Sequence, residues 1–330
     1  MNYHYLGKTN IKVSELALGC WPFAGGSVWG TQDKSDSIST VHAALDNGIN
    51  FFDTAEGYND DFHSESILGE ALKNNRNKSI IATKISPSNL IPNKIEEACD
   101  NSLRRLSTDY IDLYQIHWPN HDISLNDSMY ELNKLLEKGK IRSIGVCNFG
   151  VMDLKEIIKS GTISTDQLPY NLLWRPIEHE ILPECKTNNV GIICYSPLAQ
   201  GLLTGRYRNV EEVPDGISRS RLFNKDKPLA NHNEDGCEKE VFISIEKIKS
   251  IALELNESPA KISLSWLRYQ SNITSILVGA RNINELEMNL SAFEYDLSNE
   301  VINRLSNSTN EVKFYLGTNS DMWSSENRMR

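Results

Sequence analysis

Four ionisable side chains stand in or just after short apolar runs of the sequence. Asp53 lies in the run 50–54, Lys84 in 79–85 and His117 in 110–117, and Tyr58 comes five residues after Asp53. Runs of this kind are typical of strands that are buried on both faces of a parallel sheet. Because the carboxyl ends of parallel strands meet on one side of the sheet, we expect the four groups to converge on one face.

Such a group of side chains could assist the reduction of a carbonyl, which needs a polarised oxygen and a proton to accept a hydride. A phenol with its ordinary pKa of about 10 is a poor acid at neutral pH, and a neighbouring ammonium group lowers that pKa by stabilising the phenolate. We expect Lys84 to do this for Tyr58 if a salt bridge to Asp53 holds the lysine in place. His117 can donate a hydrogen bond to the carbonyl oxygen and orient it.

Apolar runs recur along the whole chain and predict the elements that position these residues. Successive runs start 23 to 35 residues apart, except for the last interval of 83, and the segments between them have the apolar spacing of amphipathic helices. This alternation predicts a closed (β/α)8 TIM barrel, formed by residues 1–330 as a single domain. An open doubly wound sheet is the alternative, and the absence of a glycine fingerprint after the first strand disfavours it. The eight runs are 15–20, 50–54, 79–85, 110–117, 141–147, 164–170, 190–196 and 273–279.

Three segments fall outside this repeat. Residues 3–13 predict an N-terminal β-hairpin around the turn GKTN. The long last interval is a loop insertion after the seventh strand, in which a polar, turn-rich stretch at 205–236 is typical of a lid or binding loop. Helical segments follow it at about 238–256 and 259–271. Beyond about residue 307 a polar C-terminal tail is either partly disordered or folded across the mouth of the barrel.

Three motifs resemble those of the aldo-keto reductase family, and the resemblance covers about residues 3–295. The motifs are FFDTAEGY (51–58), ATK (82–84) and LRRLSTDYIDLYQIHWP (103–119). The resemblance implies a catalytic tetrad with Tyr58 as the proton donor, made of Asp53, Tyr58, Lys84 and His117. Taken singly, each of these side chains also has a structural explanation. The first, Asp53, could be a helix cap or form a salt bridge, and Tyr58 could be a loop aromatic. In the same way, Lys84 could be a surface lysine and His117 a structural histidine.

The resemblance also implies a nicotinamide cofactor bound in an extended pose, and the family binds it without a GxGxxG motif. This chain has no GxGxxG motif either, which agrees with the resemblance. Asn148, after the strand ending IGVC, and Gln167, in DQLPYN, would hold the nicotinamide carboxamide. Tyr195 would stack on the nicotinamide ring, and the following residues would line the pyrophosphate path: Ser196, Leu198, Gln200 and Gly201. The structural alternatives are a core residue for Tyr195 and a cap for Gln167.

The segment VGARNINELEMN (278–289) would hold the adenosine end of the cofactor. Gly279 and Arg281 open a helix whose N-terminal amides favour a phosphate, and the guanidinium of Arg281 suits the 2′-phosphate. Asn289 would meet the adenine. By resemblance this implies NADPH (NADP+) in preference to NADH. Glu285 stands where the family often carries Gln, and its charge weakens that preference. Alternatively, Arg281 and Glu285 form a surface pair at the i,i+4 spacing.

Aromatic residues near the strand ends suggest a pocket for a small-molecule carbonyl substrate. Trp21 and Trp118 are the candidates for its wall, and Trp29 and Phe62 are weaker ones. The loop YNDDFHSE departs from the family pattern YGxGxSE, so loop 59–63 is unusual and no particular substrate is implied. Two acids in it, Asp60 and Asp61, disfavour anionic substrates. Three arginines of the insertion either cover the cofactor phosphates or are solvated, namely Arg206, Arg219 and Arg221.

The composition limits the partners and the location. With 34 basic and 44 acidic residues the net charge is −10, which disfavours nucleic acid and anionic membrane surfaces as partners. No apolar run approaches the length of a membrane span, and the N-terminus lacks the apolar core of a signal peptide. Six scattered cysteines indicate reduced thiols. We therefore expect a cytoplasmic protein, either a monomer or a homo-oligomer.

Two other classes of protein are weighed against a reductase. A cofactor-sensing regulatory subunit, like the potassium-channel auxiliary subunits that share the family's barrel and cofactor, is disfavoured because all four tetrad residues are present. A metal-dependent barrel hydrolase is disfavoured because the chain has no HxH motif, and Pro119 separates His117 from His121. No Cys and His cluster has zinc-ligand spacing, so we expect no metal site.

Overall fold

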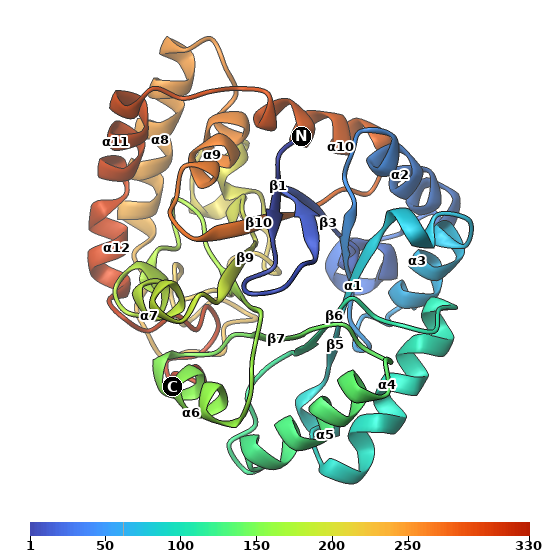
Figure 1. The fold of residues 1–330 in the computed structure, drawn as a ribbon. Helices are drawn as coiled ribbons and strands as arrows, with labels where there is room; N and C mark the ends of the chain where they lie inside the picture. The colour runs from blue at the N-terminus through green and yellow to red at the C-terminus, as the bar shows by residue number, and fades with distance from the viewer. Residues whose placement is uncertain (62) are drawn as a thin grey trace.

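The computed structural model describes residues 1–61 and 63–330, apart from the side chains of residues 27 and 28. Eight parallel strands form a closed barrel in the order β10-β3-β4-β5-β6-β7-β8-β9. Each predicted run contains one strand, which confirms the (β/α)8 TIM barrel and rules out the open sheet (Figure 1). The strands are β3 (Leu16–Gly19), β4 (Phe51–Asp53), β5 (Ile80–Ile85), β6 (Leu113–Ile116), β7 (Ile144–Cys147), β8 (Thr165–Pro169), β9 (Gly191–Tyr195) and β10 (Ile273–Gly279).

Helices surround the barrel on all sides in Figure 1. Several of them begin where the side chain of the preceding residue accepts hydrogen bonds from the first turn, as Asp33, Ser124 and Ser258 do. The two helical segments predicted after the insertion are present as α8 and α9. The helices are α1 (Gly26–Trp29), α2 (Lys34–Asp46), α3 (Ser64–Leu72), α4 (Pro92–Leu106), α5 (Leu125–Glu137), α6 (Val151–Ser160), α7 (Ile181–Asn188), α8 (Glu238–Glu254), α9 (Pro259–Arg268), α10 (Ile283–Leu290), α11 (Asn299–Ser308) and α12 (Asn310–Leu316).

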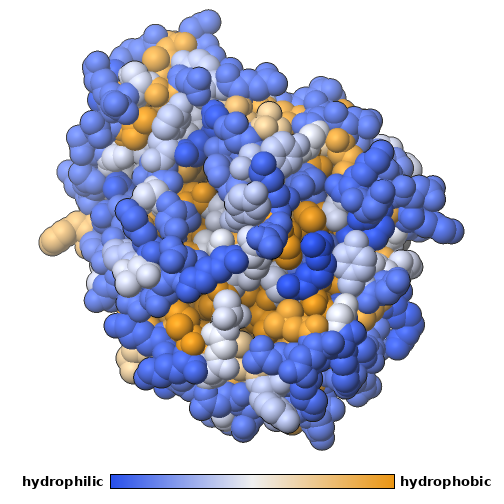
Figure 2. All heavy atoms as spheres, in the orientation of Figure 1, coloured by the Kyte–Doolittle hydropathy of each residue, from blue (hydrophilic) through white to orange (hydrophobic). Residues whose placement is uncertain are grey.

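The N-terminal hairpin closes the end of the barrel at which the strands begin. Its strands β1 (Tyr3–Tyr5) and β2 (Lys12–Ser14) pair antiparallel, and Leu6 of the turn is buried with Phe51 and Leu113 in one apolar cluster. Gly7 has a φ of +48°, and a Cβ there would lie 2.1 Å from the carbonyl oxygen of Ser164, so only glycine permits this approach. The hairpin lies across the centre of the barrel in Figure 1, and in Figure 2 hydrophobic residues show between the hydrophilic ones around it. The carboxyl ends of the strands are therefore left as the open face.

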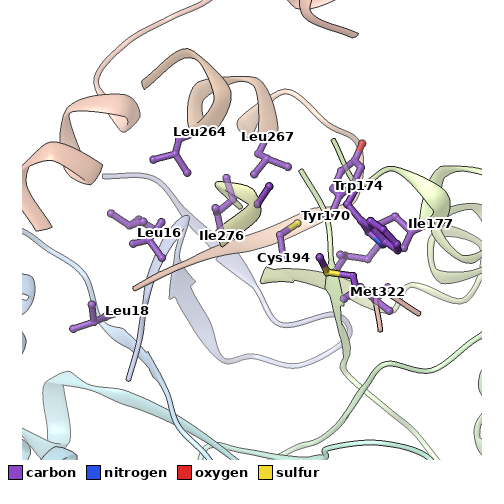
Figure 3. Packing of buried hydrophobic residues seen from close by; sticks show 14 of the residues in the cluster. Leu16, Leu18, Tyr170, Trp174, Ile177, Cys194, Leu264, Leu267, Ile276 and Met322 are labelled. Atoms are coloured by element: carbon purple, nitrogen blue, oxygen red, sulfur yellow. The ribbon is translucent and has the colours of Figure 1, made fainter. Parts of the chain in front are cut away.

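The apolar core between the barrel and its helices continues into the C-terminal tail. Leu264 and Leu267 of α9 face the outer side chains of β3 and β10, and Met322 lies beside Trp174 (Figure 3). Burying a large apolar side chain of this kind stabilises the folded state by roughly 1.5–3 kcal/mol. The tail is therefore an integral part of the core, and of the two expectations for it, the folded one is confirmed.

Arg221 of the insertion ties that loop to the tail. Its guanidinium is buried, donates from Nη1 to the carbonyl oxygens of Asn319 and Asp321, at 2.9 Å each, and pairs with Glu234 through Nε at 2.7 Å. Arg221 was expected either to cover the cofactor phosphates or to be solvated. Both expectations were wrong, because its buried guanidinium is bonded to groups inside the protein. The sequence could not show this, since the two tail residues that Arg221 contacts, Asn319 and Asp321, are 98 and 100 positions away.

All six cysteines are free and buried, and burial raises the pKa of each thiol above its ordinary value. The thiols are therefore uncharged at neutral pH and poor nucleophiles. Within the described residues, no helix is long and apolar enough to cross a membrane. The same residues include no group of three or more His, Cys, Asp or Glu side chains that could hold a metal ion.

Candidate active site

The four ionisable residues meet at the open face of the barrel. Asp53 is the last residue of β4, Lys84 lies in β5, His117 directly follows β6, and Tyr58 is in the loop after β4. Nζ of Lys84 lies 2.5 Å from Oδ1 of Asp53 and 3.3 Å from the hydroxyl oxygen of Tyr58. The rings of Tyr58 and His117 meet edge to face with centroids 5.7 Å apart. The convergence expected from the strand ends is present.

Asp53 and Lys84 form a buried ion pair, with 1% and 0% of the side chains exposed. Nζ of Lys84 also donates to the carbonyl oxygen of Thr54 at 2.8 Å. Burial alone would lower the pKa of Lys84, but the charge of Asp53, its hydrogen bond and the neighbouring Tyr58 and Cys147 together outweigh burial, and the pKa is raised above the ordinary value. Lys84 is therefore an ammonium at neutral pH, with one proton directed to Tyr58.

Tyr58 keeps its proton at neutral pH. Burial raises its pKa to about 12, although the positive charge of Lys84 acts in the opposite direction. The expectation of a net lowering was wrong, because it took account of the lysine and not of the desolvation of the ring. The ring of Trp21 stacks on Tyr58, with centroids 5.4 Å apart and planes 16° from parallel.

His117 is uncharged. Burial, together with the nearby charge of Lys84, lowers its pKa to about 3. Its main-chain nitrogen donates to Ile85, and its carbonyl oxygen accepts from Nδ2 of Asn148 at 3.1 Å. These bonds fix its backbone between neighbouring strand ends. A neutral imidazole so placed can donate a hydrogen bond to a substrate oxygen next to Tyr58.

The residues expected at the nicotinamide end lie on the next strand ends. Asn148 follows β7 with a φ of +62°, and its Oδ1 accepts from the hydroxyl of Tyr195 at 2.8 Å. Nε2 of Gln167 donates to Oδ2 of Asp53 at 2.8 Å. Of the two structural alternatives, Tyr195 does pack against the core while remaining partly exposed, whereas Gln167 lies within β8 and not at the start of a helix. Gln115, whose Nε2 donates to the same Oδ2 at 3.1 Å, is a residue that sequence reasoning missed.

The segment after β9 has an unusual backbone. Ser196, Ala199 and Gln200 all have φ values near +50°, and Gly201 has +96°. Left-handed non-glycine residues are costly and concentrate at binding sites, and backbone turned in this way forms concavities that bind anions. The guanidinium of Arg206 lies beside Gly201, where a Cβ would be 3.1 Å from its Nη2. Leu198 belongs to the same turn. The segment therefore fits the pyrophosphate of a dinucleotide.

At the expected adenosine end, Arg281 and Glu285 form the i,i+4 surface pair that the sequence offered as an alternative. Nη2 of Arg281 lies 3.0 Å from Oε1 of Glu285, and the amide of Arg281 donates to Oε2 at 2.9 Å. Asn289 donates to the carbonyl oxygen of Gly279, the last residue of β10, at 3.3 Å. Gln32, from the loop before α2, donates to the carbonyl oxygen of Arg281 at 2.9 Å. Nothing in the sequence indicated this contact between residues 249 positions apart.

Two tryptophans stand beside Tyr58 on the substrate side. Trp21 stacks on Tyr58 as described, and Trp29 meets Trp21 edge to face at 5.4 Å. Asp61 of loop 59–63 contacts this wall, since its Oδ2 accepts from the amide of Gly26, next to Trp29 in α1, at 2.8 Å. Asp61 therefore supports the wall. The candidate Phe62 lies outside the described residues.

Trp118 is covered by the C-terminal tail. The guanidinium of Arg328 lies over its ring, 4.0 Å from the centroid, and pairs with Asp321 through two bonds of 2.6 and 2.9 Å. Arg219 of the insertion lies over Trp323 of the tail in the same manner, at 4.6 Å. The tail therefore borders the face that carries Tyr58 and His117.

Asp153 on α6 anchors the last residue of the chain. Its Oδ2 accepts from the amide of Arg330 at 2.7 Å, its amide donates to the carbonyl oxygen of Arg330, and its Oδ1 lies 2.9 Å from Nε2 of His121. The tail passes directly over Gly150. A side chain at this position would clash with it, since a Cβ there would lie 2.4 Å from the Arg330 carbonyl oxygen.

Replacing Asp153 with alanine should release the end of the tail. The loss of these acceptors from a buried site is expected to cost about 2 kcal/mol of stability and to speed trypsin cleavage after Arg328 by about tenfold or more. Mass spectrometry of a trypsin time course measures the cleavage. Asp122→Ala, the change of an exposed acid nearby, is the control. Equal cleavage of Asp153→Ala and the control would show that Asp153 does not hold the tail.

Comparison with known proteins agrees with this geometry. The model of the Aldo/keto reductase family matches residues 15–309. Aldo-keto reductase YhdN of Bacillus subtilis (strain 168) is 34% identical over 301 residues, 87% of each chain. The NADH-specific methylglyoxal reductase of Escherichia coli (strain K12) is 33% identical over 317 residues, 89% of this chain and 94% of that one.

Solved structures of the same family have the same fold. Glycerol dehydrogenase of Gluconobacter oxydans superposes with a TM-score of 0.80, at 30% identity, over 94% of this chain and 95% of that one. An aldo-keto reductase of Klebsiella pneumoniae in complex with NADPH gives 0.71, at 27% identity, over 90% and 91%. The chain belongs to the aldo-keto reductase family. It is therefore an oxidoreductase, and its class of reaction is nicotinamide-dependent carbonyl reduction.

Proposed function

We propose that this protein reduces an aldehyde or ketone to the alcohol with NADPH, and that Tyr58 donates the proton. The observation that carries the proposal is the buried Asp53–Lys84 pair, with Nζ of Lys84 3.3 Å from the hydroxyl of a protonated Tyr58. A surface or purely structural lysine would not need a carboxylate partner and a phenol together in a buried site.

Each of the four residues has one task in this proposal. Tyr58 gives its proton to the carbonyl oxygen, so that its O–H bond breaks as the new O–H bond forms. Lys84 stabilises the phenolate that is left, and Asp53 holds Lys84. His117 donates a hydrogen bond to the same carbonyl oxygen and orients it. The cofactor supplies a hydride to the carbonyl carbon when bound, which balances the proton and completes the alcohol.

The residues of the chain fit a nicotinamide dinucleotide. We propose that Asn148 and Gln167 hold the carboxamide and that Tyr195 packs on the nicotinamide ring. The turn that contains Ser196, Leu198, Gln200 and Gly201 would hold the pyrophosphate. In support of this, Ser196 and Gln200 have the left-handed φ values that concentrate at binding sites. At the adenosine end, Gly279, Arg281, Glu285 and Asn289 would bind the nucleotide.

The test of the proposed function is an assay of carbonyl reduction. The purified protein is mixed with NADPH and a panel of aldehydes, ketones and sugars that includes 4-nitrobenzaldehyde, and the loss of NADPH absorbance is followed. We expect turnover with at least one aldehyde. No observation favours a cofactor-sensing regulatory subunit, and a protein that binds NADPH but turns over no carbonyl of the panel would revive that alternative.

We propose NADPH in preference to NADH, because Arg281 can exchange Glu285 for a phosphate. Arg281 is exposed and Glu285 is partly exposed, and a surface pair of this kind is worth about 0.5 kcal/mol. A charge-assisted bond to a 2′-phosphate is worth about 1.5–3 kcal/mol, so the phosphate wins. Among related proteins, one structure contains NADPH and one relative is named NADH-specific.

Two substitutions test this preference in opposite directions. Arg281→Ala should raise the Kd for NADPH by about tenfold and leave that for NADH within about twofold. Glu285→Gln should lower the Kd for NADPH by about threefold, because it removes the competing carboxylate. Both values are measured by quenching of tryptophan fluorescence. If Arg281→Ala weakens NADPH and NADH equally, Arg281 does not read the 2′-phosphate.

A further inference from the structure

Gln115 lies inside the barrel among the four residues, and the proposed function gives it no task. It is on β6 two residues before His117, so both side chains point to the interior side of the strand. It pairs in register with Lys84 of β5 on one side and Gly145 of β7 on the other. Its side chain is completely buried.

Gly145 leaves room for this side chain. A Cβ at Gly145 would lie 3.1 Å from Cγ of Gln115 and 2.7 Å from Oγ1 of Thr165. The missing side chain on the neighbouring strand therefore provides the space in which the Gln115 amide reaches Asp53. A buried amide is costly unless it is hydrogen-bonded. Oε1 of Gln115 has no partner among the residues that the structure describes, so the donation from Nε2 is what holds the amide in place.

The two oxygens of Asp53 have separate partners. Oδ1 accepts from Lys84, whereas Oδ2 accepts from Nε2 of Gln115 at 3.1 Å and from Nε2 of Gln167 at 2.8 Å. With both donors on Oδ2, the carboxylate cannot rotate without breaking three bonds. Because the nitrogen of the Gln167 amide faces Asp53, its Oε1 is directed away from Asp53. There it accepts a weak hydrogen bond from the thiol of Cys147 at 3.8 Å, and its second lone pair can accept from another donor.

We propose that Gln115 is a positioning residue, which with Gln167 clamps Oδ2 of Asp53 and thereby fixes both the direction of Lys84 and the orientation of the Gln167 amide. This inference rests on the proposed function for its kinetic consequences. The residue touches neither substrate nor the reacting atoms. It acts through Asp53 on Lys84, which stabilises the tyrosyl oxygen, and on Gln167, which meets the cofactor.

The test uses two substitutions at this position. Gln115→Leu keeps the volume and removes the donor, so kcat should fall by about tenfold or more, with KM for the carbonyl within about twofold, and the Kd for NADPH should rise by about threefold. Gln115→Glu places a carboxyl group against Asp53. Only its protonated form can donate to Oδ2, so its activity relative to the parent protein should rise as the pH falls from about 9 to about 6. A residue that merely fills space would not produce this pH-dependent recovery.

Tyr114→Phe is the matched control. Tyr114 precedes Gln115 on the same strand, is buried, and its hydroxyl has no hydrogen-bond partner, so this change should alter neither kcat nor the Kd for NADPH. The Kd is measured by tryptophan fluorescence quenching and therefore tests the inference even if no carbonyl of the panel is reduced. If Gln115→Leu does not fold, the pH recovery of Gln115→Glu decides. A kcat and Kd within twofold of the parent for Gln115→Leu, or no pH-dependent recovery for Gln115→Glu, would overturn the inference.

Discussion

Tyr58→Phe should lower kcat for carbonyl reduction by about 10²–10⁴-fold and leave the Kd for NADPH within about twofold. The substitution removes one oxygen and keeps the ring, so its stacking on Trp21 at 5.4 Å and its contact with His117 are preserved. The lost oxygen is the one that lies 3.3 Å from Nζ of Lys84. The loss should therefore appear in the chemical step and not in the binding of cofactor.

The pH dependence of the parent protein provides an independent check on this residue. Because the pKa of Tyr58 is raised to about 12, the phenol stays protonated and able to donate across neutral and moderately alkaline pH. The rate of reduction should not fall through loss of the Tyr58 proton until the pH approaches that value. A Tyr58→Phe variant that retains more than about a tenth of the parent kcat would remove Tyr58 from its proposed role.

Asp53→Asn should destabilise the protein and abolish reduction. Oδ1 of Asp53 accepts from Lys84 and Oδ2 accepts from two glutamine amides, and the new amide has only one oxygen. In either orientation its NH2 group must face a donor, and Lys84 loses its carboxylate. Removing one partner of a buried ion pair costs about 3–5 kcal/mol. Urea unfolding at neutral pH measures the loss.

The pKa of Lys84 is the reason for measuring unfolding at neutral pH. Because the pKa of Lys84 is raised in the folded protein above its ordinary 10.5, the stability that the pair contributes is fully present below that ordinary value. It is lost only as the pH rises through the higher pKa of the folded state. Unfolding at neutral pH therefore reports the whole effect.

The double variant Asp53→Asn with Lys84→Met separates stability from activity. Without the ammonium, the new amide can direct its oxygen to the glutamines and its nitrogen away from them, and the methionine fills the space of the lysine. Replacing a buried ion pair with groups of similar volume is often neutral, so the double variant should recover much of the lost stability while its reduction activity stays absent. If the two single substitutions simply add in free energy, the pair is not coupled.

The strands and their order could be predicted from the sequence because most of the barrel strands are rich in apolar residues on both faces. Ile80–Ile85 and Gly191–Tyr195, for example, fall within runs that no surface strand could carry. From the barrel it follows that Asp53, Lys84 and His117 meet, since each stands near a strand's carboxyl end. Tyr58 lies in the loop after β4, where a strand-end rule alone would have missed it, and the motif FFDTAEGY (51–58) points to it.

What the sequence could not provide were contacts made across long distances in the chain. The guanidinium of Arg221 donates hydrogen bonds to carbonyl groups of the tail, and no local sequence pattern distinguishes it from a solvated arginine. The pKa of Tyr58 depends on how far Trp21 and the neighbouring loops desolvate the ring, which only the packed structure reveals. Gln115 could have been noticed as a polar residue in an otherwise apolar strand, two positions before His117.

The transfer of hydride from nicotinamide to a carbonyl carbon, with Tyr58 as the acid, is the central claim. The most direct test supplies NADPH in which both hydrogens at nicotinamide C4 are replaced by deuterium. The protein is incubated with this cofactor and 4-nitrobenzaldehyde, or the best carbonyl of the panel, and the alcohol is analysed by mass spectrometry and NMR. We predict one deuterium on the former carbonyl carbon, formed by the parent protein and not by Tyr58→Phe. An alcohol without deuterium, or equal labelling by both proteins, would contradict the account.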